Sequence, residues 1–127
     1  MQILEKKKLN LLVHLAKVDG KFVKSERILL ESFLKEKGLD ESQLFEKEHP
    51  LKFSDFTHLQ EKIELLYWAL RLIQADKVIH PKEVLFCQNL ATKLSFKPES
   101  IDHFAHNPLP SFQAFEQEVK SFWISGG

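Results

Sequence analysis

Apolar residues along the chain recur with the spacing of an α-helix. They fall three or four positions apart from one end to the other, and no segment shows the sustained alternation and turn punctuation of β-strands. The pattern predicts an all-α fold. The expected helices cover about residues 3–18, 24–37, 57–75, 81–94, 98–105 and 111–123, with a short helix from about 40 to 50 in addition.

Residues that end or begin helices lie between these segments or at their first positions. Gly20 and Gly38 follow the first two, Pro81 is suited to a first helical turn, and the Asn107–Pro110 segment precedes the last.

The aromatic face of that last helix, around Phe115, is expected to dock on the domain rather than to bind a partner helix. Connections are short and no low-complexity segment divides the chain. We therefore expect one domain over residues 1–127, a bundle of about seven helices.

Two parts of the chain repeat one pattern, which predicts two related helical hairpins. In the first part, Glu26 and then an apolar stripe follow the segment Leu12–Asp19. In the second part, Glu83 and a similar stripe follow the segment Ala69–Asp76. Asp19 and Asp76 are 57 residues apart, as are Glu26 and Glu83.

These four acids fall where apolar residues would be expected. Each glutamate is followed by apolar residues three, four and seven positions later, so it begins the buried stripe of its helix. Each aspartate ends the apolar stripe of the preceding helix. A carboxylate beside a core costs several kcal/mol unless it is bonded, paired or protonated. The carboxyl groups of four residues must therefore be hydrogen-bonded, paired or protonated. These are Asp19, Glu26, Asp76 and Glu83.

Three accounts remain open for these acids. In the first, each aspartate accepts hydrogen bonds from free backbone N–H groups of the next helix, and each glutamate lies in a first turn favoured by the helix dipole. In the second, the four supply oxygen ligands to Ca²⁺ or Mg²⁺. In the third, they pair with bases such as Lys24, Arg27, Arg71 or His80. The spacing is not that of an EF-hand, because Lys21 and Val23 occupy positions that need oxygen ligands.

The segments 15–26 and 72–83 resemble the doubled A-x-x-D-G-x-(apolar)-x-x-x-E motif of the TerB-like family. That family includes tellurite-resistance proteins and the N-terminal region of DjlA-type membrane-anchored DnaJ co-chaperones. The likeness covers roughly Leu4 to Phe104. It implies an all-helical domain linked to stress and tellurite resistance, with metal binding through Asp19, Glu26, Asp76 and Glu83. The second copy has Lys77 where the family usually has Gly, which weakens the case for metal there.

Composition and charge disfavour several classes of function. The 18 basic and 18 acidic residues cancel, so nucleic-acid binding is disfavoured, and the basic run Lys6–Lys8 is expected to be a solvated turn. The single cysteine, Cys87, is expected to be a core residue and fits a reducing, cytoplasmic location. No apolar run is long enough to span a membrane. His103 and His106 share a helical face but lack further ligands, so we expect solvent-facing polar residues.

The function expected from these observations is non-enzymatic. No phosphate loop, nucleophile elbow or metalloprotease motif is present. We expect a protein-interaction module in a stress response, with the four acids as a candidate site for a divalent cation and no other cofactor. The alternatives are a structural domain of a larger co-chaperone-type or envelope protein and a hydrolase that uses paired carboxylates. The oligomeric state is not predicted.

Replacing Asp19 or Asp76 by Ala separates capping from metal binding. If these acids cap helices, each substitution should cost on the order of 0.5–2 kcal/mol in metal-free buffer. We expect this loss for both, and a larger one for Asp19→Ala, because Lys77 beside Asp76 suggests a more exposed turn. If the acids are metal ligands, removing their mutual repulsion should leave the metal-free protein at least as stable. Thermal melts in chelator with neither variant less stable than the parent would refute capping.

Overall fold

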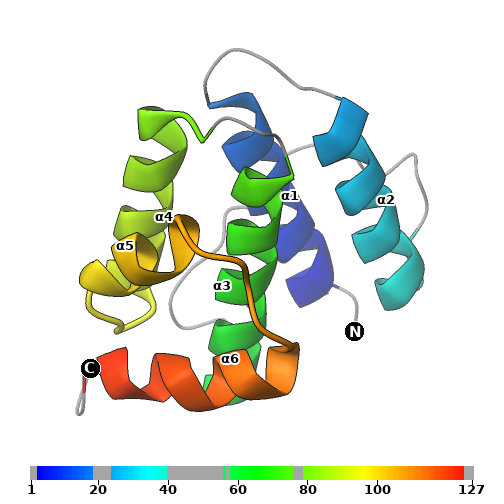
Figure 1. Cartoon of the computed structure of the whole chain (residues 1–127). Coiled ribbons are helices and arrows are strands. Elements are labelled where there is room, and N and C mark those ends of the chain that lie inside the picture. Colours follow the sequence, from blue (N-terminus) through cyan, green and yellow to red (C-terminus); the bar gives the residue numbers. More distant parts are fainter. Residues whose placement is uncertain (1–2, 19–23, 40–55, 57, 76–78, 125–127) are drawn as a thin grey trace.

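The computed structural model describes residues 3–18, 24–39, 56, 58–75 and 79–124, and the regular elements within these ranges are helices (Figure 1). The elements are α1 (Ile3–Lys17), α2 (Lys24–Lys37), α3 (Leu59–Gln74), α4 (Pro81–Lys93), α5 (Glu99–Ala105), α6 (Phe112–Val119) and a 3₁₀ turn, η3 (Lys120–Phe122). The predicted all-α class is confirmed for this part of the chain. None of these helices combines the length and the apolar character that crossing a bilayer requires.

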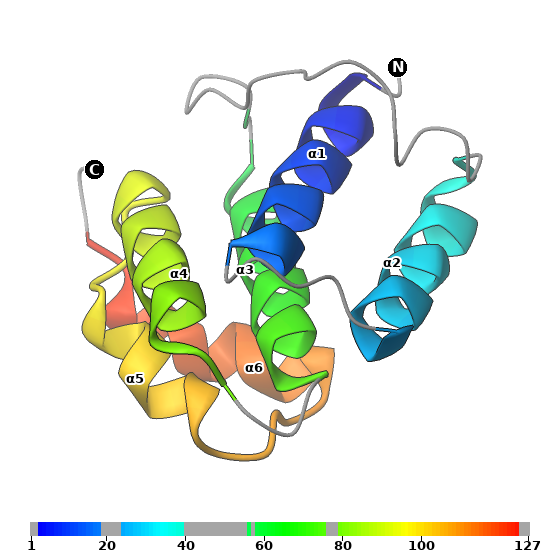
Figure 2. The same cartoon turned by 90° about the horizontal axis from the view of Figure 1, so that it is seen from above.

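Helix α3 forms the centre of the bundle. It packs against α1, α2, α4, α5 and α6. Figures 1 and 2 show α2 on one side of the α1–α3 pair and α4 on the other. A helix in this position must be apolar on most of its circumference. Its buried residues are Ile63, Leu65, Leu66, Trp68, Ala69, Leu70, Leu72 and Ile73.

The sequence placed most of these elements within a residue or two. The expected helices at 3–18, 24–37, 57–75, 81–94 and 98–105 correspond to α1 through α5. The last one is divided, since α6 ends at Val119 and a 3₁₀ turn follows. Phe115 and Val119 are fully buried and α6 packs on α3, so docking of this helix is confirmed. The short helix expected from about 40 to 50 lies outside the described residues, as does Gly20, and the count of seven stays a prediction.

One expectation about charge is wrong. Lys8 is only 1% exposed, so the basic run does not form a solvated turn. Its ammonium lies 3.4 Å from Glu5 Oε1 and 3.6 Å from Glu64 Oε1, and Lys37 of α2 donates to Glu64 Oε1 at 2.6 Å. A lysine can be buried when its head group meets carboxylates. The pairs connect α1, α2 and α3 at one end of the bundle.

The ion pair with Glu64 also changes the pKa of Lys37. Burial lowers the pKa of the Lys37 ammonium, but the hydrogen bond to Glu64 and the charges of Glu64, Glu5 and Glu36 outweigh this effect. The pKa of Lys37 therefore lies above its ordinary value, and the side chain is charged at neutral pH.

Helices α2 and α4 end in the same kind of turn. At the end of α2, Leu39 N–H donates to Leu34 O at 2.8 Å, with Gly38 at a φ of 68°. At the end of α4, Phe96 N–H donates to Ala91 O at 2.8 Å, with Ser95 at a φ of 70°. This Schellman arrangement favours glycine at the left-handed position. Ser95 therefore holds a conformation in which its Cβ is unfavourable.

Replacing Ser95 by Gly should stabilise the protein. The substitution removes the Cβ from the left-handed turn, a gain of about 1 kcal/mol that the greater freedom of Gly in the unfolded chain partly offsets. We expect a net rise in the free energy of unfolding of about 0.5 kcal/mol in urea titrations. Ser95→Ala is the matched control and should bring no gain, because it keeps the Cβ. A glycine variant no more stable than the alanine variant would contradict this account.

Candidate functional site

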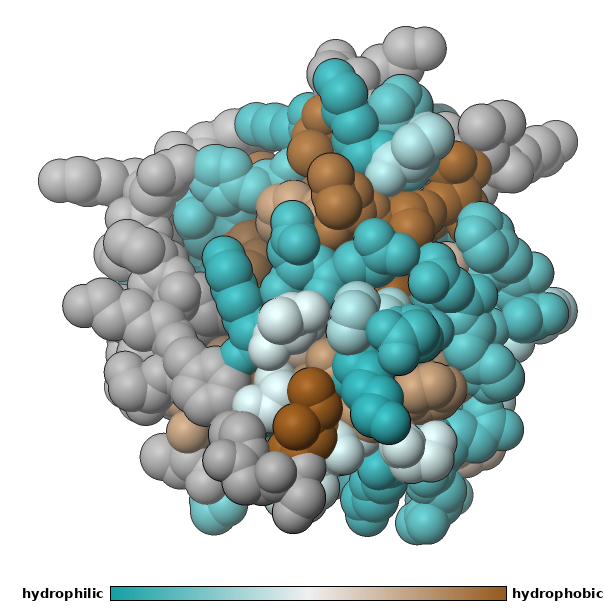
Figure 3. All heavy atoms as spheres, turned by 90° about the vertical axis from the view of Figure 1, so that its left-hand side faces the viewer, coloured by the Kyte–Doolittle hydropathy of each residue, from teal (hydrophilic) through white to brown (hydrophobic). Residues whose placement is uncertain are grey.

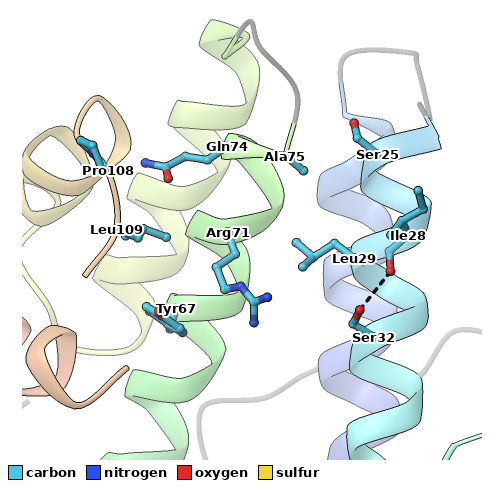
Figure 4. A pocket seen from close by; sticks show the side chains of 10 residues that line it. All are labelled: Ser25, Ile28, Leu29, Ser32, Tyr67, Arg71, Gln74, Ala75, Pro108 and Leu109. Carbon is cyan, nitrogen blue, oxygen red and sulfur yellow. Dashed lines mark hydrogen bonds between the residues drawn. The ribbon is translucent and has the colours of Figure 1, made fainter. Parts of the chain in front are cut away.

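A groove of about 540 Å³ lies along the face of α3 between α2 and the segment that connects α5 to α6. In Figure 4, α3 forms the floor, α2 forms one wall, and Pro108 and Leu109 lie on the other side. Cavities of roughly 300–1,000 Å³ are typical of ligand sites in proteins. The lining residues are Ser25, Ile28, Leu29, Ser32, Tyr67, Arg71, Gln74, Ala75, Pro108 and Leu109.

Two side chains of α3 hold the 108–109 wall in place. The amide nitrogen of Gln74 is within 3.0 Å of three backbone carbonyl oxygens, those of Phe104, Ala105 and Asn107. These include acceptors that the last turn of α5 leaves without helical partners. The Tyr67 hydroxyl donates to Pro110 O at 2.7 Å. Because both donor side chains belong to the central helix, the wall is fixed to the floor.

The wall formed by α2 presents aliphatic surface. α2 runs antiparallel to α3, since Lys37 near its end pairs with Glu64, whereas Ser25 near its start lines the groove with Ala75. Leu29 packs against the core, and Ile28 is 55% exposed. Ile28 and Leu29 therefore add aliphatic surface to one side of the groove.

Leu85 of α4 is equally exposed, at 57%, but it does not line the groove. On the face of the molecule that carries α4, the apolar areas are separated by hydrophilic side chains (Figure 3). Leu85 is therefore a suitable reference position for Ile28.

Arg71 is the charged residue of the groove. Its guanidinium carbon lies 4.4 Å from the centroid of the Trp68 ring and 5.9 Å from that of Tyr67. Trp68 is in turn fixed by an edge contact with Phe33 of α2, with ring centroids 5.1 Å apart. Among the described residues, no carboxylate lies within ion-pair distance of Arg71. The guanidinium is thus oriented by aromatic rings rather than by an acid.

The predicted metal residues lie apart where the structure describes them. Glu26 and Glu83 are each the third residue of their helix, and each is 3% exposed. However, α1 and α3 lie between α2 and α4 (Figure 2). Within the described ranges, no group of three or more His, Cys, Asp or Glu side chains is placed to hold a metal ion. Asp19 and Asp76 lie outside the described residues.

Glu83 takes part in a capping box. His80 is the N-cap of α4: its Nδ1 accepts from Lys82 N–H at 3.1 Å, and its own N–H donates to Glu83 Oε1 at 3.0 Å. The sequence suggested Asp76 as the acceptor for the first N–H groups of this helix, and it considered His80 as a base. In the structure His80 is the capping residue, and its main-chain N–H rather than its imidazole binds Glu83.

The remaining candidates are structural. Cys87 is fully buried, and burial, followed by the charge of Glu83, raises the pKa of its thiol above the ordinary value. The expected core role is confirmed. His103 and His106 are both exposed, as expected, and the His103 ring lies against Phe104 and Phe122.

Comparisons of the chain with protein-family models, with curated proteins and with solved structures gave no match. The resemblance to the TerB-like family therefore stays a prediction that rests on the doubled motif.

The sequence interpretation missed the groove, although a signal was present. Glu64, Tyr67, Arg71 and Gln74 follow one another at helical spacing, and the other positions of the helix from Ile63 onward are apolar. Such a polar line on a central helix indicates partners or solvent on that face. In the structure Glu64 binds lysines, and Tyr67, Arg71 and Gln74 line the groove.

Replacing Gln74 by Ala should destabilise the protein and release the 108–109 wall. The variant removes the side-chain donor from three carbonyl oxygens, of which, within the described ranges, only that of Phe104 keeps a backbone N–H donor, from His106, and the loss should be about 1–3 kcal/mol. Urea titrations measure this loss, and amide hydrogen exchange at His106, Asn107 and Leu109 should accelerate. Gln88→Ala is the matched control, because Gln88 makes one exposed bond to Asp102, and it should change stability by less than about 0.5 kcal/mol. Equal effects in the two variants would contradict the proposed role of Gln74.

Proposed function

We propose that this chain is a non-enzymatic, TerB-like helical domain of a cytoplasmic stress response of the tellurite-resistance kind. It binds a protein partner in the groove that lies on α3 between α2 and the α5–α6 segment. The observation that carries the proposal is the groove itself. It joins an exposed isoleucine, a fixed wall and an oriented guanidinium in one concave surface. Protein interfaces are enriched in aromatic residues and arginine at their centres.

The construction of the groove supports binding rather than chemistry. Its lining offers aliphatic, aromatic, hydroxyl and amide groups around one cation. Neither a carboxylate pair nor a histidine is among these lining residues, so a carboxylate-based hydrolase finds no support here. A purely structural domain of a larger co-chaperone-type or envelope protein remains the alternative. It does not account for an open groove with one wall fixed by Gln74 and Tyr67.

Binding of Ca²⁺ or Mg²⁺ by Asp19, Glu26, Asp76 and Glu83 is a second candidate function. One observation favours it: Glu26 and Glu83 occupy the same position in their helices and are buried to the same degree. This equivalence also supports the proposed repeat of two hairpins. A site for one cation would have to combine the two hairpins, and the position of α2 and α4 on opposite sides of α1 and α3 counts against it. The chelator melts of the two aspartate variants test it.

Photo-crosslinking tests the proposed function. Benzoylphenylalanine at position 28 should give a discrete adduct with a partner in cells that naturally make the protein. The same group at position 85 is the matched control, since Leu85 is equally exposed outside the groove. Ser32→Trp should reduce the adduct from position 28 about tenfold, because the indole fills the groove. Equal adducts from both positions, no adduct from position 28, or an adduct insensitive to Ser32→Trp would contradict the proposal.

A further inference from the structure

The groove has a charge requirement that its own residues do not meet. Arg71 is the cation among the described lining residues, and none of those residues is acidic. The nearest acid along the same helix face, Glu64, pairs with Lys8 and Lys37 instead. A ligand that fills the groove removes water from the guanidinium, and this desolvation is unfavourable unless the ligand supplies acceptors.

The orientation of Arg71 restricts the chemistry of that acceptor. Its planar head is held over Trp68, which keeps the guanidinium edge available for a second planar group. A carboxylate matches this fork with two parallel hydrogen bonds. Recognition of phosphate polymers generally uses several basic residues, whereas the described lining of the groove contains one.

Apolar surface lies on both sides of the cation. Ile28 and Leu29 line the groove from α2, and Leu109 lines it from the opposite wall (Figure 4). An aliphatic side chain next to the carboxylate would be buried between these walls, which adds the hydrophobic contribution that a single ion pair lacks.

We propose that the groove binds a segment of a partner protein that presents an Asp or Glu carboxylate beside an aliphatic side chain. The carboxylate binds the Arg71 guanidinium, and the aliphatic group packs against Ile28, Leu29 and Leu109. This inference rests on the proposed function and specifies the chemistry of the partner.

A random dodecapeptide library selected on the full chain tests this specificity. Enriched peptides should carry Asp or Glu next to Leu, Ile or Val. A synthetic enriched peptide and its amide counterpart, with Gln or Asn in place of the acid, are then compared by titration calorimetry. The amide peptide should bind the parent protein about ten- to a hundredfold more weakly. Arg71→Gln should weaken the acidic peptide by a similar factor while leaving the amide peptide nearly unaffected.

Control variants keep the test independent of folding. Arg71→Lys retains the charge but loses the fork, so binding should fall between that of the parent and Arg71→Gln. Ile28→Asp should abolish binding, because it places a carboxylate within the groove, and Leu85→Asp should not change it. Melting curves establish that each variant is folded. If Arg71→Gln does not fold, the comparison of the acidic and amide peptides on Arg71→Lys replaces it.

The outcomes separate the two proposals. If binding requires Ile28 but the acidic peptide and its amide counterpart bind equally well, the carboxylate inference is overturned. The groove then remains a binding surface. Enriched peptides that bind Ile28→Asp as tightly as the parent, or no enrichment at all, would count against both.

Discussion

The structure depends on the burial of one helix. α3 contacts most of the other helices, and apolar side chains cover most of its circumference. Burial of that surface is the largest favourable contribution that the fold can obtain from a single element. The polar residues of α3 must then find partners or solvent, because an unsatisfied buried group costs about as much as the burial of an aliphatic side chain gains.

The need of these polar residues for partners explains why one face of α3 forms both a cluster of ion pairs and a groove. Near the start of the helix, Glu64 binds lysines of α1 and α2 and ties these three helices together. Toward the other end, Tyr67 and Gln74 bind backbone carbonyls at the end of α5 and in the segment that follows it, which lines the groove opposite α2. Arg71 lies between them without an acid among the described residues. The helix that stabilises the bundle thus also carries a cation that no acid of the described residues pairs with.

Helical periodicity was sufficient to predict the fold class and most helix boundaries, since glycine and proline mark the ends. It could not predict that Lys8 is buried, because that depends on Glu64, which is distant in sequence and lies on another helix. It placed Glu83 correctly at the head of a buried stripe, but it did not identify His80 as the cap, a residue that rarely has this role. The groove depends on carbonyls at the end of α5 and just after it that accept from Gln74, and no periodic pattern in the sequence pairs them with that residue.

The central claim is that Arg71 and a partner carboxylate recognise each other directly in the groove. A double-mutant cycle measures this contact, combining Arg71→Gln in the protein with the exchange of acid for amide in a groove-binding peptide. Calorimetric titrations of the four combinations give the coupling free energy. The account predicts a coupling of roughly 1.5–3 kcal/mol, as for a hydrogen bond between charged groups. Additive effects, with a coupling below about 0.5 kcal/mol, would contradict it.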